Sequence, residues 1–205
     1  MLRREFLAAV LASTFASVPA WAAQETPEAF IIRVSGDILQ AIAKDPRLTQ
    51  GDMPAIQKLV DEKMMPAVDF LRMTRMAVGP MWRQADTAQR EKLMSLFRQI
   101  LINVYSGALS MAKDQKVRIL PHGQNDGVEA IVRTAMASPG KPEVQIVYRL
   151  RNIKEKGWRV IDVNVEGVWL VSNYRSQFGS VAANEGIDGL IARMQERANE
   201  PQTKS

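Results

Sequence analysis

The chain has 205 residues, a formal net charge of +5 and no cysteine. This length suits one domain with a sizeable hydrophobic core. The lack of cysteine excludes a disulfide framework, a thiolate metal site, a cysteine nucleophile and the lipid-modified cysteine of a bacterial lipoprotein. Lysine and arginine are spread without a basic run, so we do not expect nucleic acid as a partner.

The first 22 residues read as a secretory signal peptide. Arg3 and Arg4 precede a largely apolar, uncharged stretch, and Ala20-Trp21-Ala22 forms a small-residue cleavage site. The apolar stretch is shorter than the roughly 20 residues that a membrane-spanning helix needs. The segment from Arg3 to Leu7 is also similar to a twin-arginine signal, which leaves the export route open. We therefore expect a single domain over residues 23–199, outside the cytoplasm, and a polar tail over residues 200–205.

Four helices are predicted before residue 115. The first begins with Thr26 as N-cap and Pro27 at the first helical position, and it stops at Asp45-Pro46. A short helix follows Asp52, and a third begins after Met65-Pro66, contains Phe70 and ends at Gly79-Pro80. The longest begins at a capping box from Asp86 to Gln89, carries a wide apolar stripe and runs to about Lys113.

From Gln115 the hydrophobic pattern alternates, which predicts strands. Strands are expected over residues 116–120, 128–136, 144–151 and 157–165, joined by turns rich in Gly, Pro, Asn and Asp. Short turns between successive strands predict an antiparallel meander with one apolar face. In the last strand both alternating sets of positions carry apolar residues, so the sequence does not decide which set faces inward.

The residues after this strand return to a helical pattern. A short apolar run from Val168 to Val171 passes into a helix that carries Tyr174 and Phe178, followed by polar turns and a last helix from Gly186 to Asn199. The order of elements predicts an α+β domain in which a curved, four-stranded antiparallel sheet packs against about six helices.

Candidate catalytic residues are few. His122, the single histidine, lies in a turn and is expected to face solvent, and the chain contains no common nucleophile, zinc or nucleotide motif. Asp162 lies among apolar strand residues, where burial would raise its pKa and allow it to act as a base. We favour the alternative that Asp162 pairs with an arginine or accepts backbone hydrogen bonds at the corner between strand and loop.

The methionine content indicates an adaptable apolar cavity. Seven of the eleven methionines fall between residues 64 and 111, close to Phe70, Trp82, Phe97 and Tyr105. Methionine is unbranched and common where a surface must accept varied apolar partners. A helical layer over a curved sheet leaves room for such a cavity.

Several segments, taken together, match the pattern of one known family. They are Asp69-Phe70-Leu71-Arg72-Met73, Gly79-Pro80-Met81-Trp82-Arg83, Gln89, Phe97, Tyr105, Val147-Tyr148-Arg149-Leu150, Trp158-Arg159-Val160-Ile161-Asp162-Val163, Val165-Glu166-Gly167-Val168 and Asn173-Tyr174-Arg175-Ser176-Gln177-Phe178. In these segments the chain resembles the MlaC family, also called the toluene-tolerance family, and the resemblance covers nearly all of the chain after the signal peptide, in order. One departure is Trp169, where the family often has serine after Glu-Gly-Val, and this could alter the cavity lining or its mouth.

The resemblance implies a soluble periplasmic carrier of phospholipid in a Gram-negative bacterium. Such a carrier exchanges lipid between an outer-membrane lipoprotein complex and an inner-membrane ABC transporter, which maintains the lipid asymmetry of the outer membrane. It also implies a cone-like sheet, similar to nuclear transport factor 2, that buries the acyl tails and leaves the head group near solvent. Phospholipid is then the cargo, and we expect no enzymatic activity, cofactor or metal.

Alternation and helical face select the residues expected to line the cavity. Two other classes stay open: an enzyme of the steroid-isomerase kind that uses Asp162 with Tyr148 or Tyr105, and a binding module with a large exposed apolar patch for a protein partner. The predicted lipid-binding residues are Phe70, Met73, Trp82, Phe97, Ile100, Leu101, Val104, Tyr105, Val132, Ile146, Tyr148, Val163, Trp169 and Tyr174.

Overall fold

The computed structural model describes residues 25–112, 114–138, 140 and 142–200. The predicted signal peptide, and all of the predicted tail except Glu200, lie outside the described residues. Within the described part of the chain, no helix is both long enough and apolar enough to cross a membrane.

Local capping signals set the first helices. The Thr26 hydroxyl accepts a hydrogen bond from the Ala29 N–H at the start of α1 (Pro27–Lys44), as predicted. Asp45 ends α1 and also caps the four-residue α2 (Pro46–Thr49), which the sequence did not predict. The helix expected after Asp52 is α3 (Met53–Leu59), and it continues into a π-helical turn, η1 (Val60–Met64).

The third predicted helix begins later than expected. Residues Met65–Ala67 form a 3-10 turn, η2, and Asp69 then caps α4 (Phe70–Val78) by accepting a hydrogen bond from the Arg72 N–H. The backbone N–H of Asp69 donates to the Val160 carbonyl at 2.9 Å, which keeps this segment extended along β5 (Gly157–Val165). After a second 3-10 turn, η3 (Gly79–Arg83), the predicted capping box of Asp86 and Gln89 opens α5 (Thr87–Met111).

The sheet contains the four predicted strands and two short ones. In addition to β5, the long strands are β1 (Lys116–Ile119), β3 (Glu129–Ala137) and β4 (Val144–Ile153). The two-residue strands β2 (Gln124–Asn125) and β6 (Val168–Trp169) raise the total from the predicted four to six. All pairings are antiparallel in the order β1-β3-β4-β5-β6, with β2 also on β3, so the meander is confirmed.

A β-bulge settles which face of β5 points inward. Arg149 lies opposite Asp162 and Leu150 lies opposite Val160, so Ile161 is an extra residue that reverses the alternation. Because of this reversal, Trp158 and Val160 share the inner face of the sheet with Val163 and Val165. The inner face is the one that packs against α1.

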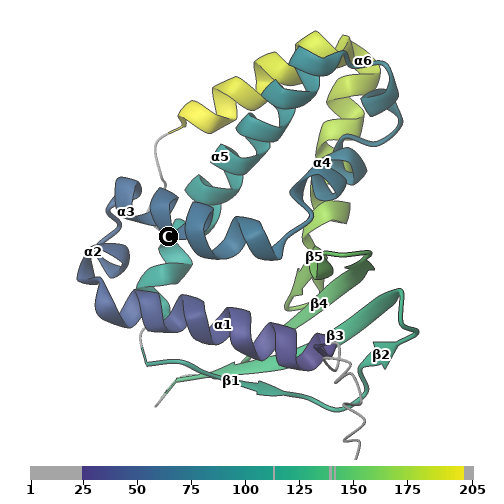
Figure 1. Cartoon of the computed structure of the whole chain (residues 1–205). Helices are drawn as coiled ribbons and strands as arrows, with labels where there is room; N and C mark the ends of the chain where they lie inside the picture. The colour runs from purple at the N-terminus through teal and green to yellow at the C-terminus, as the bar shows by residue number, and fades with distance from the viewer. Residues whose placement is uncertain (1–24, 113, 139, 141, 201–205) are drawn as a thin grey trace, which may run out of the picture.

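The final helical segment corrects one prediction. The residues after Phe178 are helical instead of polar turns, and α6 (Leu170–Asn199) continues to a break at Gly186. The backbone of Gly186 has φ 70° and ψ −170°, a conformation that is essentially restricted to glycine. α6 therefore has two arms, and Figure 1 shows the second arm turning back beside α5.

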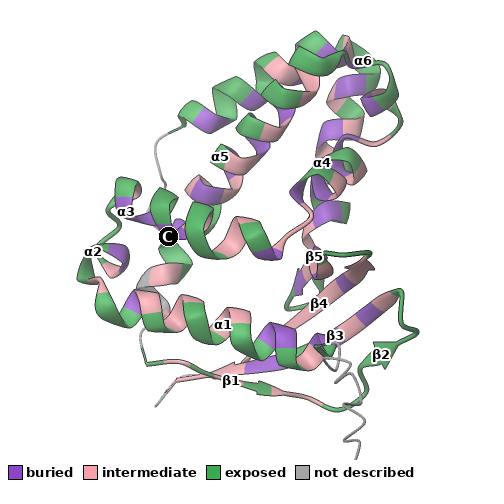
Figure 2. Cartoon of the chain, in the orientation of Figure 1, coloured by how far each residue is buried: buried purple, intermediate pink, exposed green. Residues whose placement is uncertain are grey.

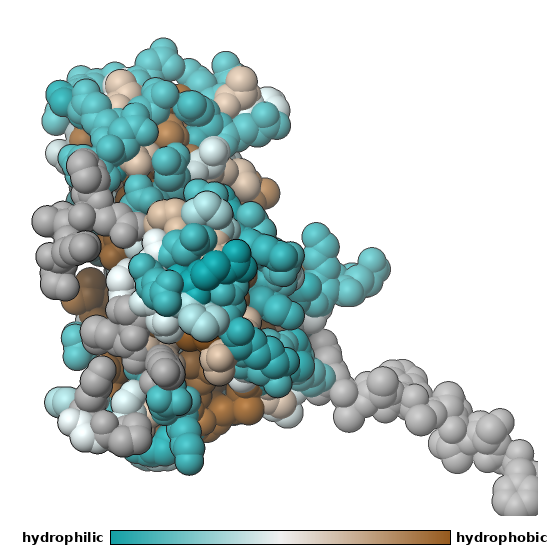
Figure 3. Space-filling model, turned by 90° about the vertical axis from the view of Figure 1, so that its left-hand side faces the viewer, coloured by the Kyte–Doolittle hydropathy of each residue, from teal (hydrophilic) through white to brown (hydrophobic). Residues whose placement is uncertain are grey.

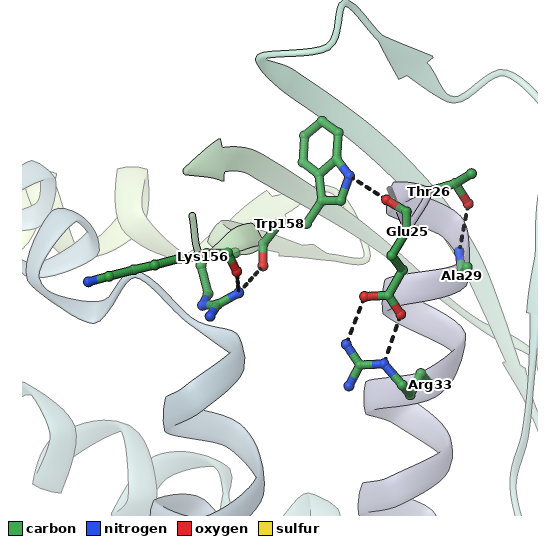
Figure 4. Close-up of polar contacts among 7 residues, drawn as sticks. Glu25, Thr26, Ala29, Arg33, Lys156 and Trp158 are labelled. Carbon is green, nitrogen blue, oxygen red and sulfur yellow. Dashed lines mark hydrogen bonds and ion pairs between the residues drawn. The ribbon is translucent and has the colours of Figure 1, made fainter. Parts of the chain in front are cut away.

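One tether fixes α1 across the sheet. The indole N–H of Trp158 donates to the Glu25 carbonyl at 2.9 Å, just before the α1 cap (Figure 4). The Glu25 carboxylate in turn accepts two hydrogen bonds from Arg33, which lies about two turns further along the chain in α1. The start of α1 is therefore held on the inner face of the sheet.

The buried side chains form three separate clusters, which we name by their position. The helical cluster lies between α4, α5 and α6 and includes Phe97 and Tyr174; the sheet cluster joins α1 to the inner face through Phe30 and Leu150. A third, the α2–α3 cluster, packs α2 and α3 against the far end of α5. Figure 2 shows that buried residues occur in both the helices and the sheet. A domain of this size usually has one contiguous core, so this division is unusual.

Candidate functional site

Six of the fourteen predicted binding residues lie within the helical cluster. Their exposed fractions are 8% or less, and Leu101 packs against them partly buried. The Phe97 ring centre lies 5.7 Å from that of Phe70, 5.0 Å from that of Tyr174 and 5.5 Å from that of Phe178. These distances are those of well-packed aromatic pairs. The six residues are Phe70, Met73, Trp82, Phe97, Ile100 and Tyr174.

A second set of predicted residues lies on the inner face of the sheet. Val132, Tyr148 and Val163 are neighbours across β3, β4 and β5, and all three belong to or pack against the sheet cluster. Ile146 is on the same face and is only partly buried. The structure therefore brings these four residues together, but in a different cluster from the six on the helices.

The last three predicted residues are more exposed. On α5, Val104 and Tyr105 have exposed fractions of 50% and 43%. Trp169 pairs with Asn164, which places its side chain on the outer face of the sheet, and the Arg149 guanidinium lies 4.7 Å from its ring centre. Trp169 therefore does not share a face with Tyr148 or Val163.

Seven partly buried apolar side chains pack against one or two of the three clusters, and we call this set the apolar seam. Val68 packs against both the helical and the sheet clusters, Met65 and Leu101 pack against the helical cluster, and Ile38 and Val60 pack against the α2–α3 cluster. On the sheet side the seam is formed by Tyr148 and Val163. We define the seam by these seven residues: Ile38, Val60, Met65, Val68, Leu101, Tyr148 and Val163.

Tyr148, on the sheet side of the seam, is largely enclosed by protein without being fully buried. Burial raises the pKa of its phenol, with an opposing contribution from hydrogen bonding to Thr134 and Ser35. The side chain nevertheless keeps part of its surface accessible, although β4 is the central strand of the sheet. Tyr148 therefore combines a largely desolvated phenol with a partly accessible side chain.

The seam continues into an apolar row at one end of the inner face. Ile146 lies opposite Val165, and Val165 lies opposite Val168. The exposed fractions of Val165 and Val168 are 38% and 58%. This row gives the inner face an apolar, open end.

The binding set predicted from the sequence omitted part of the seam. Ile38, Val60, Met65 and Val68 were not in it, although Ile38 lies on the apolar stripe of α1 and Met65 is among the clustered methionines. Those two patterns were the available signals. Val68 had none, because its role depends on a bridge to Val160 that is distant in the sequence.

Asp162 has a structural role in this arrangement. It is 1% exposed, and its Oδ1 accepts hydrogen bonds from the N–H groups of Val163 at 2.9 Å and Val171 at 3.0 Å. Burial raises the pKa of its carboxyl, while the two N–H donors and the charge of Arg149 act in the opposite direction. The backbone bonds confirm the interpretation that this residue fixes the corner between strand and helix. His122 is exposed at a positive φ, as expected of a turn residue.

Three surface recesses lie along the sheet and are separate from the seam. Their volumes are about 270, 470 and 340 Å³, and all three include Gln124 of β2. Of the fourteen predicted residues they include Val132 and Trp169. Figure 3 shows mostly hydrophilic side chains on one side of the molecule, with a hydrophobic patch exposed in its lower part.

A curved sheet closed by helices over an apolar seam is a form suited to holding an apolar ligand. The family described as MlaC protein matches residues 33–196. The chain therefore belongs to the MlaC family.

Individual proteins with known names or structures agree with this assignment. The intermembrane phospholipid transport system binding protein MlaC of Haemophilus influenzae is 22% identical over 183 residues, covering 87% of this chain and 85% of that protein. The toluene tolerance protein ttg2D of Pseudomonas putida is 22% identical over 189 residues, covering 92% and 86%. The solved structure of a phospholipid-binding protein from Ralstonia solanacearum, in complex with a phospholipid, matches with a TM-score of 0.79 and 32% identity, covering 86% of this chain and 97% of that one.

Proposed function

We propose that this chain is a periplasmic phospholipid carrier that buries acyl chains along the seam. The observation that carries the proposal is the divided core, whose three clusters are each flanked by partly buried apolar side chains. The similar Ralstonia solanacearum structure, which holds a phospholipid, supports it. Each buried methylene contributes about 0.8 kcal/mol, so two acyl chains outweigh any head-group contact. Such a carrier selects tails and tolerates varied head groups.

Among the predicted binding residues, we propose that those at the seam and its open end contact the lipid. These are Leu101, Ile146, Tyr148 and Val163, with Val104 and Tyr105 on the exposed part of α5. The six residues of the helical cluster form the wall behind them. Phe97 and Tyr174 keep that wall rigid because their rings pack edge to face.

We further propose that the carrier exchanges lipid between an outer-membrane lipoprotein complex and an inner-membrane ABC transporter. A lipid held by its tails leaves only when a partner opens the seam or offers a better apolar path. The name of the Haemophilus influenzae relative, which refers to an intermembrane phospholipid transport system, supports this placement. No catalytic residue is required for this function.

Lipid transfer between vesicles tests the carrier function. Donor vesicles contain a fluorescent phospholipid and a quencher, acceptor vesicles contain neither, and the protein without residues 1–22 is added in catalytic amount. A carrier raises the rate of dequenching in proportion to protein concentration. A rate equal to that of vesicles alone contradicts the proposal.

A further inference from the structure

The outer face of the sheet is strongly basic and has no part in the seam. It carries an arginine from each of four strands in neighbouring register positions. Two of its arginines are neutralised, since Arg118 pairs with Glu143 at 2.8 Å and Arg151 with Glu129 at 2.8 Å. The arginines of this face are Arg118, Arg133, Arg149, Arg151 and Arg159.

Arg133 and Arg149 lie together on this face, and the charge of Arg149 acts on the buried Asp162 carboxyl without forming an ion pair with it. They belong to adjacent strands, because Arg133 pairs with Val147, two residues before Arg149. Neither lies within ion-pair distance of a carboxylate among the described residues. Arg133 donates to the carbonyl of His122 at 3.3 Å, and the buried Asp162 near Arg149 directs its Oδ1 to two backbone N–H groups.

A hollow surrounds these two arginines. One recess of about 340 Å³ includes Arg133 and Trp169, and an adjoining one of about 470 Å³ includes Arg149. The two recesses share Gln124 and Ile131, so they adjoin, and we refer to the two together as the hollow. The Arg149 guanidinium rests on the Trp169 ring at 4.7 Å, which orders it before any partner arrives.

We propose that this hollow docks an acidic polypeptide segment of a partner protein, whose carboxylates bind Arg133 and Arg149. A planar guanidinium binds a carboxylate with two parallel hydrogen bonds, and an arginine already stacked on an aromatic ring loses little freedom in doing so. Arginine and tryptophan are also the residues enriched at the energetic centres of protein interfaces. The dimensions of the hollow suit one or two side chains and the backbone that carries them.

The pattern of charge favours a polypeptide over a membrane surface. Asp126 and Glu129 line the same hollow as Arg149. Glu129 is paired with Arg151, but a uniformly anionic bilayer would bring negative charge against the Asp126 carboxylate as well as against the arginines. A polypeptide presents discrete carboxylates that match Arg133 and Arg149 and leave the acidic positions free. The inference does not depend on the proposed lipid binding, because the docking segment needs no acyl chain.

Binding of a labelled octaglutamate peptide to the full folded protein tests this site. Fluorescence anisotropy at low salt measures the affinity for wild type, for Arg133→Gln/Arg149→Gln, and for Arg75→Gln/Arg83→Gln. The last variant is the matched control, because it removes two exposed positive charges from the helical layer. We expect the first variant to bind at least tenfold more weakly than wild type and the control to bind within twofold of it.

Substitution of Trp169 separates ordered docking from net charge. Trp169→Ser removes the ring beneath Arg149 without changing the charge, and we expect it to bind the peptide severalfold more weakly. Trp169→Phe should restore the affinity. Thermal unfolding of each variant confirms that it is folded. The proposal is overturned if Arg133→Gln/Arg149→Gln and Arg75→Gln/Arg83→Gln lose affinity for the peptide equally, or if neither loses any. Tighter binding to phosphatidylglycerol vesicles than to the peptide, with the same dependence on Arg133 and Arg149, also overturns it and assigns the face to a membrane.

Discussion

The carboxylate of Asp162 on β5 accepts a hydrogen bond of 3.0 Å from the N–H of Val171 in the first turn of α6. That N–H would otherwise lack a partner, because the first four N–H groups of a helix have none within it. The bond joins the sheet to the helical layer on one side of the seam. Val68, which bridges to Val160, makes the corresponding connection from η2.

Truncation of Asp162 should destabilise the protein. Asp162→Ala leaves two buried N–H groups without their acceptor, and each such group costs about 1–3 kcal/mol. Asp162→Asn keeps an acceptor oxygen and should cost less. Urea unfolding measures both variants, with the exposed Asp37→Asn as control. Wild-type stability in the alanine variant would show that the bonds do not hold the corner.

Tyr174 should make stability depend on alkaline pH. Burial, and to a lesser degree the nearby phenol of Tyr105, raises the pKa of Tyr174 to about 12, with an opposing effect from Arg197. The pKa of an unfolded tyrosine is about 10. The folded state therefore holds this proton more tightly, so the stabilisation is fully present below about pH 10 and is lost as pH rises towards 12. Urea unfolding of wild type and Tyr174→Phe between these pH values should show a steeper loss for wild type, and parallel curves would refute the assignment.

Substitution by alanine should change the stability of the protein in opposite directions at two glycines, Gly186 and Gly36. The backbone of Gly186 has φ 70°, and no atom lies within 4 Å of an added Cβ, so Gly186→Ala should cost about 1–3 kcal/mol through backbone strain alone. Gly36 lies inside α1 and its added Cβ also meets nothing within 4 Å. Gly36→Ala should therefore stabilise by about 0.5–1 kcal/mol. Chemical denaturation of both variants checks the pair, and equal signs would contradict the kink at Gly186.

Filling the seam should displace the lipid. Val163→Trp places a large side chain beside Tyr148 on the inner face, in the space proposed for an acyl chain. The protein should purify with less than about a tenth of the wild-type phospholipid, since the lost burial amounts to several methylenes at about 0.8 kcal/mol each. Val128→Trp, at a position 53% exposed, is the matched control and should keep its lipid. A folded Val163→Trp protein that purifies with the full wild-type amount of lipid would show that the seam is not the binding site.

The structural features that the sequence predicted best are those determined by residues close together in the chain. The cap at Thr26, the capping box of Asp86 and Gln89 and the turns between the long strands all follow from residue type and spacing within a few positions. The resemblance of whole segments to the MlaC family also predicted the cone-like sheet covered by helices. The expected structural role of Asp162 was also correct, because a lone acid among apolar strand residues needs donors close by.

The features that sequence could not predict depend on contacts distant in the chain. The bulge at Ile161 is defined only by pairing with β4, and it decides which residues of β5 face inward. Trp169 faces the outer side because β6 folds back on β5, whereas its apolar character alone suggested the interior. The helix beyond Phe178 is polar on the surface but packs Ala182 against the helical cluster, so tertiary contact overrode the turn-like composition.

Lipid analysis of the purified protein tests the central claim most directly. The chain without residues 1–22 is expressed in a Gram-negative host and purified without detergent, then measured by native mass spectrometry and by organic extraction. The account predicts one or two phospholipids per chain, with mixed head groups and release only under conditions that unfold the protein or supply an apolar acceptor. A protein that is free of lipid and that also fails to take up added phospholipid would contradict it.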